Sequence, residues 1–233
     1  MNTLMHICCA PCANRPIDLL RSEGLSVTGF WFNPNIHPYT EYQARKRTLE
    51  DYAKEIALKL VIGGTYDLRT FITHVADNID GRCTYCYRVR MEETAKYAAE
   101  HGYDAFTTSL LISPYQNHEA IQAAARAAGE RYGVEFLYRD FRPLFQAGQQ
   151  FAREHGFYMQ KYCGCIFSEE ERYMAAKWKK KAARSSSCPL PLLPRGKRKP
   201  PGAGRRARGA PGGRPHPPTP RPPPYGGSRG FFA

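Results

Sequence analysis

Residues 4–12 read L-M-H-I-C-C-A-P-C, an apolar entry followed by three cysteines within five positions. A short apolar run of this kind is typical of a buried strand, which we expect over Leu4–Cys9. The next segment ends at a glycine, Gly24, which favours a helix over Arg15–Gly24. The fold is therefore predicted to begin with a strand that carries thiols at its end and leads into a helix.

The rest of the chain repeats this alternation of strand and helix. Strands separated by helices of ten or more residues are typical of a parallel sheet covered on both faces. We therefore expect one α/β domain with a mostly parallel, Rossmann-like sheet, and a metal site at the C-terminal ends of its strands, where such sheets bind ligands. The further strands are expected at 26–33, 59–62, 105–112 and 134–140, and the helices at 40–57, 67–77, from the loop G-R-C-T-Y-C to His101, 119–132, and 145–155.

The net charge of +13 is concentrated at one end of the chain. Residues 185–233 hold ten Lys and Arg, no acid and 13 of the 19 prolines, whereas residues 1–184 carry a net charge of only +3. A segment so poor in periodic apolar residues cannot offset its ordering entropy, so we expect a disordered basic tail over 185–233 and a catalytic domain over 1–184. The tail either adds nonspecific affinity for RNA or is dispensable.

Membrane and export signals bear on the compartment. No apolar run reaches the roughly 18 to 20 residues of a membrane span, and the N-terminus lacks the basic and apolar regions of a signal peptide. The sequence therefore predicts a cytoplasmic protein without a membrane partner.

Eight cysteines are many for a cytoplasmic chain, and seven of them cluster. In a reducing compartment this pattern indicates metal or redox chemistry rather than structural disulfides. The clusters are C-C-x-x-C (Cys8, Cys9, Cys12), C-x-x-C (Cys83, Cys86) and C-G-C (Cys163, Cys165), and Cys188 stands alone in the predicted tail.

The adjacent pair Cys8 and Cys9 favours an iron-sulfur cluster over zinc. Neighbouring cysteines fit poorly on one small tetrahedral ion but can reach separate irons of a 4Fe-4S cluster. The combination of C-C with C-x-x-C resembles the pattern of assimilatory sulfonucleotide reductases. We therefore expect the cluster on Cys8, Cys9, Cys83 and Cys86, with zinc and free thiols or disulfides as the alternatives.

Three cysteines remain after four have been assigned to one cluster. Cys163 and Cys165 are expected either to cycle as a redox-active dithiol or to bind an additional iron together with Cys12. Both alternatives place electron transfer beside the substrate.

Six further segments stand out along the chain: H-I-C-C-A-P-C, F-N-P-N-I-H-P-Y-T-E-Y-Q-A-R, G-R-C-T-Y-C-Y-R-V-R-M, F-T-T-S-L-L-I-S-P-Y-Q, Y-R-D-F-R and K-Y-C-G-C-I-F-S. Together they resemble the QueH-type epoxyqueuosine reductases. The resemblance covers about residues 4–175 in the family's order, and one departure is Met159, where family members tend to have Arg.

The resemblance implies a cobalamin-independent oxidoreductase that deoxygenates epoxyqueuosine at the tRNA wobble position, the last step of queuosine biosynthesis. It also implies a cluster on the four cysteines named above and a redox-active or metal-binding pair at Cys163 and Cys165. The implied partners are tRNA carrying epoxyqueuosine and a reduced electron-carrier protein. The alternative functions are an iron-sulfur sulfonucleotide reductase and a noncatalytic zinc-binding RNA module.

Other polar and aromatic residues complete the expected site. Asp140 is expected to stabilise the departing oxygen as an acid, and Tyr115 and Gln116 to contact the nucleobase from the end of a strand. Arg90 is expected to bind a tRNA phosphate or to offset the negative charge of the cluster, with a solvated helix face as the alternative. His6 is either a buried core histidine or a hydrogen-bond donor to a cluster sulfur.

Overall fold

The computed structural model describes residues 1–174 and 177. These residues form a five-stranded sheet in which every paired strand is parallel to its neighbour. The strand order is β3-β2-β1-β4-β5, so β1 lies at the centre. The strands are β1 (Asn2–His6), β2 (Ser26–Trp31), β3 (Leu60–Ile62), β4 (Ala105–Thr108) and β5 (Glu135–Phe136). The predicted tail over 185–233 lies outside the described residues.

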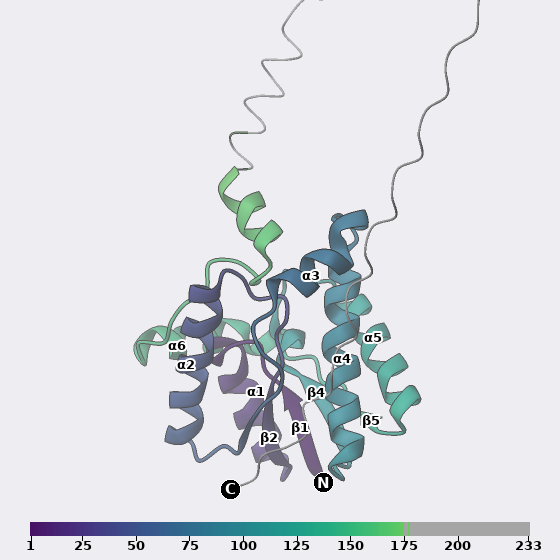
Figure 1. The fold of residues 1–233 in the computed structure, drawn as a ribbon. Coiled ribbons are helices and arrows are strands. Elements are labelled where there is room, and N and C mark those ends of the chain that lie inside the picture. The colour runs from purple at the N-terminus through teal and green to yellow at the C-terminus, as the bar shows by residue number, and fades with distance from the viewer. Residues whose placement is uncertain (175–176, 178–233) are drawn as a thin grey trace, which may run out of the picture. The chain divides into compact units, whose positions relative to one another are not determined.

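Helices cover both faces of this sheet, as predicted (Figure 1). One face is covered by α1 (Ala10–Ser22), α2 (Tyr39–Glu55) and α6 (Phe145–Glu154), and the other by α4 (Arg82–Glu100) and α5 (His118–Tyr132). A shorter helix, α3 (Leu68–Val75), lies beyond the upper ends of the strands in Figure 1. The single-turn helices are η1 (Ala76–Asn78), η2 (Ser109–Ile112) and η3 (Arg142–Leu144).

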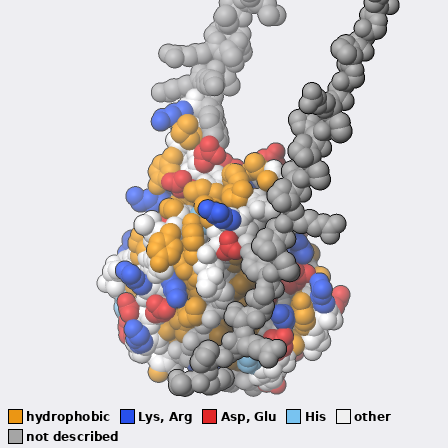
Figure 2. All heavy atoms as spheres, viewed as in Figure 1, with side chains coloured by type: hydrophobic (Ala, Val, Ile, Leu, Met, Phe, Trp, Pro, Cys, Tyr) orange, Lys and Arg blue, Asp and Glu red, His pale blue; other side chains and the backbone are white. Residues whose placement is uncertain are grey.

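The core lies between the sheet and its two helical layers. Leu4 and Met5 of β1 and Phe106 of β4 have no exposed surface, as expected for central strands buried on both faces. Figure 2 shows Lys, Arg, Asp and Glu side chains interspersed on one face of the described residues. Within the same residues, no helix combines the length and the apolar character needed to cross a membrane.

The first cysteines lie in a turn rather than at the end of a strand. β1 stops at His6, and α1 begins at Ala10, five residues before the predicted helix start. Pro11 occupies the first turn of α1, where the missing N–H costs no hydrogen bond, so the early proline starts the helix instead of delaying it. Cys8 and Cys9 therefore connect β1 to α1, and Cys12 lies on the first turn of the helix.

The expected strand over 105–112 is also too long. The strand β4 ends at Thr108, whose hydroxyl accepts a hydrogen bond from the backbone N–H of Leu110 at 3.1 Å. This contact begins the single turn η2, so Ser109 leaves the sheet next to the end of β1.

Candidate metal centre

Three thiols meet where β1 leads into α1. The sulfur atoms of Cys8, Cys9 and Cys12 all lie within 4.8 Å of one another, and Cys8 Sγ is 3.7 Å from Cys9 Sγ. All three side chains are buried. Because β1 is the central strand, these thiols lie at the C-terminal edge of the sheet, as predicted for the metal site.

Side chains from two other segments donate hydrogen bonds to these sulfurs. Ser109, the first residue of η2, donates to Cys8 Sγ at 3.5 Å, and its hydroxyl accepts from the Cys8 backbone N–H at 3.1 Å. Gln160 donates its amide to Cys9 Sγ at 3.0 Å and to Cys12 Sγ at 3.4 Å. The Gln160 Oε1 atom is buried without a partner among the described residues.

Within this group of three thiols, Cys8 is the one that most readily loses its proton. Hydrogen bonds from Cys12 and Cys9 hold the pKa of the Cys8 thiol well below its usual range, whereas burial raises the pKa of Cys9 and the hydrogen bond to Cys8 raises that of Cys12. Thiolates are the donors that iron-sulfur clusters and soft metals prefer. The donor set therefore fits a thiolate-bound metal group.

The C-x-x-C pair lies on the first turns of α4, not in the loop before it. Cys83 is exposed and Cys86 is buried, and burial raises the pKa of the Cys86 thiol to about 12. Arg90, one helical turn further on, donates to Cys86 Sγ at 3.0 Å and to the Cys86 carbonyl at 2.9 Å.

The C-G-C segment brings a second pair of thiols towards α4. Cys163 is exposed, and Cys165 is buried against Phe71 and Val75 of α3. Tyr85 of α4 packs against the same cluster, so the C-G-C segment lies near the first turns of α4. Among the described residues, the sulfurs of Cys8, Cys9 and Cys12 form one close group, and the C-x-x-C and C-G-C thiols do not belong to it.

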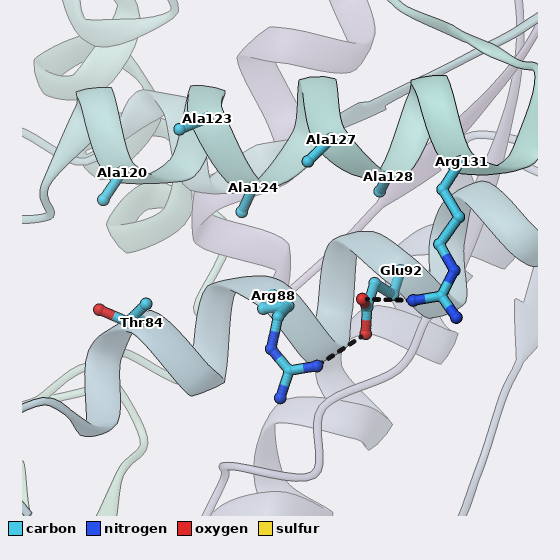
Figure 3. Close-up of a pocket in the computed structure, with 9 residues that line it drawn as sticks. All are labelled: Thr84, Arg88, Glu92, Ala120, Ala123, Ala124, Ala127, Ala128 and Arg131. Atoms are coloured by element: carbon cyan, nitrogen blue, oxygen red, sulfur yellow. Dashed lines mark hydrogen bonds and ion pairs between the residues drawn. The ribbon is translucent and has the colours of Figure 1, made fainter. Parts of the chain in front are cut away.

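One cavity of the described residues lies elsewhere. It measures about 380 Å³, and Figure 3 shows it between the alanine-rich side of α5 and the side of α4 that carries Thr84, Arg88 and Glu92. Its lining includes no cysteine, and Glu92 pairs with both Arg88 and Arg131. We therefore do not assign the reaction to this cavity.

Residues 3–171 match the family described as Epoxyqueuosine reductase QueH. The chain belongs to this family. It is therefore an oxidoreductase of the epoxyqueuosine reductase type, which confirms the resemblance and removes the two alternative functions.

Individual relatives show the same relationship. Three proteins named Epoxyqueuosine reductase QueH come from Dehalococcoides mccartyi, Thermotoga maritima and Haemophilus influenzae, and are 37%, 35% and 31% identical to the chain. The alignments cover 73%, 72% and 78% of this chain and 93%, 91% and 76% of the relatives.

Similarity to solved structures is much lower. The U34-tRNA thiolase NcsA from Methanococcus maripaludis with its 4Fe-4S cluster is 12% identical, with a TM-score of 0.46 over 84% of this chain and 76% of the thiolase. A predicted subunit of tRNA methyltransferase from Methanocaldococcus jannaschii gives a TM-score of 0.43 at 14% identity over 67% of this chain and 89% of that protein. At such low TM-scores, neither likeness indicates a ligand or an activity for this chain.

Cys12 lies with Cys8 and Cys9 in the described structure, although the sequence analysis grouped it with the C-G-C pair. The prediction groups Cys12 with Cys163 and Cys165, whereas its sulfur lies within 4.8 Å of the other two thiols of its own motif. The turn of α1 explains this, because Cys12 follows Cys9 by three residues and the two are linked by a 3.3 Å backbone hydrogen bond.

Two of the predicted site residues, Asp140 and Arg90, are engaged with neighbouring groups. Asp140 accepts two side-chain hydrogen bonds from Arg142, at 2.8 and 2.6 Å, which lower its pKa to about 2. At neutral pH Asp140 is therefore ionised, and its role at the departing oxygen stays a prediction. Arg90 is 3% exposed and donates to Cys86 Sγ, so it does not lie on a solvated helix face, and its contact to a tRNA phosphate stays a prediction.

The predicted nucleobase contacts lie on the surface. Tyr115 is 85% exposed, and its ring packs edge-on against Phe145 at 5.8 Å between centroids. Gln116 is half-buried beside it. Both residues follow η2, which begins at Ser109 beside Cys8, so this loop leads from the thiols to the surface.

His6 is a satisfied core histidine. Its Nδ1 lies 2.9 Å from the Thr108 hydroxyl and its Nε2 lies 3.1 Å from the Phe32 carbonyl. Burial lowers the pKa of His6 to about 3, so the ring is neutral. Because both ring nitrogens have protein partners, His6 is a core histidine and not a hydrogen-bond donor to a cluster sulfur.

His37 gives a testable dependence of stability on pH. It has no exposed surface, its two ring nitrogens lack partners among the described residues, and burial lowers its pKa to about 4. Because the unfolded histidine titrates near 6.5, unfolding takes up a proton between about pH 6.5 and 4, so the folded state loses on the order of 2 kcal/mol as pH falls through this window. We expect His37→Phe to flatten the fall of the unfolding free energy in urea titrations over this range; equal pH dependence in both proteins would contradict this.

Gly164, at the centre of C-G-C, has a backbone conformation and surroundings that disfavour any side chain. Its φ is +112°, and a Cβ there would lie 2.9 Å from Ile36 Cγ1 and 3.2 Å from Arg45 Nη1. We expect Gly164→Ala to lower the free energy of unfolding by about 1–3 kcal/mol in urea titrations. Gly156→Ala is the matched control, because Gly156 also has a positive φ but its Cβ would meet no atom within 4 Å. Equal losses in the two variants would show that the crowding at Gly164 has no effect.

Proposed function

We propose that this chain reduces the epoxide of epoxyqueuosine in tRNA to the alkene of queuosine, the last step of queuosine biosynthesis. The reaction takes up two electrons and two protons and releases the oxygen as water. The observation that carries the proposal is the buried group of Cys8, Cys9 and Cys12 at the C-terminal edge of the sheet, in a chain that belongs to the QueH family.

We further propose that Cys8, Cys9, Cys83 and Cys86 hold a 4Fe-4S cluster. The close approach of Cys8 and Cys9 supports the first half of this set, and the buried Cys86 on the first turns of α4 supports the second. When bound, the cluster supplies electrons one at a time. Arg90 places a positive charge at the Cys86 sulfur and so stabilises its thiolate form.

The remaining thiols have two proposed uses. Cys163 and Cys165 either cycle between dithiol and disulfide or bind a second iron together with Cys12. Gln160 supports a site that includes Cys12, because its amide spans the sulfurs of Cys9 and Cys12. The Gln160 Oε1 atom, which has no partner within the described part of the chain, can accept a hydrogen bond from a substrate hydroxyl, which would orient the substrate beside the thiols.

Repeated turnover needs an outside source of electrons. The thiols of the chain can hold electrons but are oxidised when they give them up, so we propose a reduced electron-carrier protein as the partner. The exposed Cys83 and Cys163 mark the part of the site that such a carrier can approach.

We propose Tyr115 as a stacking platform for a base of the anticodon loop. An exposed aromatic ring fixed by a second ring is the arrangement that RNA-binding proteins use for unpaired bases. Tyr115→Ala is expected to raise KM for the tRNA by about tenfold, since base stacking contributes about 1–3 kcal/mol, and to leave kcat within about twofold. Tyr115→Phe keeps the ring and should retain the wild-type KM; a KM for Tyr115→Ala equal to wild type would refute the stacking role.

Complementation in cells tests the proposed function. A bacterial strain without its own epoxyqueuosine reductase accumulates the epoxide in its tRNA. Expression of this chain should convert that nucleoside to queuosine, and expression of Cys9→Ser should not. Persistence of the epoxide at normal levels of soluble, iron-loaded protein would contradict the proposal.

A further inference from the structure

One buried arginine connects α2 to the C-G-C segment. The Arg45 side chain is 1% exposed, although it lies on a helix whose next arginine, Arg47, is exposed. Burying a guanidinium is costly unless its N–H groups are paired, so the partners of Arg45 indicate its purpose.

Those partners are backbone carbonyl groups at the start of the C-G-C segment. Arg45 donates from Nη2 to the Tyr162 carbonyl at 2.9 Å and from Nη1 to the Cys163 carbonyl at 3.2 Å. The same segment is tied to the turn after β2, because the His37 N–H donates to the Gly164 carbonyl at 2.7 Å and the Tyr162 hydroxyl donates to the His37 carbonyl at 2.5 Å. The C-G-C backbone is therefore held at consecutive residues.

Arg45 is itself held in place by a carboxylate. Glu41, one turn earlier on α2, accepts from Arg45 Nε at 2.6 Å, and its other oxygen accepts from the Tyr158 hydroxyl. The Glu41 side chain is 7% exposed, so the pair is shielded from water. This carboxylate balances the buried charge and also lies 2.6 Å from Nη2, while both Nη groups donate to the carbonyls.

The residues between Tyr158 and Gly164 cross from one thiol group to the other. Tyr158 contacts Glu41, Gln160 contacts the sulfurs of Cys9 and Cys12, and the carbonyls of Tyr162 and Cys163 contact Arg45. A shift of this segment against α2 would therefore move the C-G-C thiols and the Gln160 amide together.

We propose that Arg45 is a positioning residue that fixes the C-G-C thiols relative to Cys9 and Cys12. The contacts above support the role of Arg45 in holding this segment in place. The effect of Arg45 on turnover rests on the proposed function. Lysine cannot replace Arg45, because a single ammonium group lacks the planar fork that pairs with two carbonyls and a carboxylate at once.

The kinetic test compares Arg45→Lys with the wild type and with Arg47→Lys as the matched control. Reactions that depend on close placement lose up to about a hundredfold from a displacement near 1 Å, so we expect kcat to fall at least about tenfold in Arg45→Lys, with KM for the tRNA within about twofold. Arg47→Lys should match the wild type. An unchanged kcat, an equal fall in Arg47→Lys, or a raised KM at unchanged kcat would overturn the inference.

The second test needs no reductase activity. Under anaerobic conditions the full chain is treated with a thiol-alkylating reagent, and the labelled cysteines are quantified by mass spectrometry. We expect Cys165, buried in the wild type, to be alkylated about tenfold faster in Arg45→Lys. The reagent reaches this thiol only when the C-G-C segment opens locally, and the weaker hold on the segment makes such opening more frequent. Tyr158→Phe, which keeps Arg45 but releases Glu41, should shift labelling in the same direction and covers the case in which Arg45→Lys does not fold. If the folded variants are alkylated at the wild-type rate, the inference is overturned. If the variants are alkylated faster but the wild-type protein has no reductase activity, only the proposed function is contradicted.

Discussion

Cys9→Ser is expected to abolish both iron binding and turnover. Cys9 is 1% exposed, and its sulfur lies 3.7 Å from that of Cys8 and accepts the Gln160 amide at 3.0 Å. Substitution of a group that only supports a metal ligand costs about 10–100-fold in affinity or activity, and loss of a proposed ligand should cost more than the upper end of that range. Iron and sulfide analysis of anaerobically purified protein, together with the rate of queuosine formation, measures the effect.

Cys188→Ser is the control for this substitution, because it removes a thiol from the predicted tail and should leave iron content and turnover at wild-type values. Stoichiometric iron with full turnover in Cys9→Ser would refute the assignment of Cys9. Stoichiometric zinc and no iron in the wild type would refute the proposed cluster itself.

Cys165→Ser is expected to stop turnover without removing the cluster. The thiol is buried against Phe71 and Val75, on the C-G-C segment that Arg45 holds. In both proposed uses of the pair, as a dithiol and as a ligand to a second iron, Cys165 is needed for electron transfer to the substrate. The queuosine yield should fall by at least about a hundredfold, since residues that act as a unit lose most of their effect when one is removed.

The visible absorption of the cluster separates this role from a structural one. An absorption spectrum equal to that of the wild type, with turnover lost, would agree with the proposed division of the cysteines. Loss of the absorption together with turnover would show that Cys165 is a cluster ligand and that the proposed set is wrong. Full turnover would remove Cys165 from the mechanism.

The fold could be predicted because it rests on a repeated pattern. Apolar runs such as the one at Leu4 and helical spacing such as that of α2 follow from local geometry, and together they indicate a parallel α/β sheet. Element ends were less predictable. They depend on single contacts, such as the Thr108 hydroxyl that ends β4 and the proline that starts α1 early.

The candidate site could be predicted in its thiols but not in the side chains around them. Cysteine spacing is visible in the sequence, and it pointed to Cys8 and Cys9, whose sulfurs lie 3.7 Å apart in the structure. The assignment of Cys83 and Cys86 to the same site stays a prediction. The surroundings of Arg90 and Asp140 depend on helix orientation and on a local ion pair, which a linear pattern does not show.

Gln160 and Arg45 could not be predicted for a related reason. The Gln160 amide reaches Cys9 from a segment far along the chain, and no spacing rule predicts that contact. Arg45 carried a usable signal, since Glu41 stands four residues before it on a predicted helix. Such pairs are usually solvent-exposed, and only the tertiary structure shows that this one is buried.

The most direct test of the proposed reaction is reduction of the substrate by the purified protein. The anaerobically purified full chain, reduced with dithionite, is incubated with tRNA that carries epoxyqueuosine, and the nucleosides are then separated and identified by mass spectrometry. We predict loss of epoxyqueuosine and formation of an equal amount of queuosine, with Cys9→Ser inactive in parallel. Unchanged epoxyqueuosine in the presence of iron-loaded, reduced wild-type protein would contradict the proposed function.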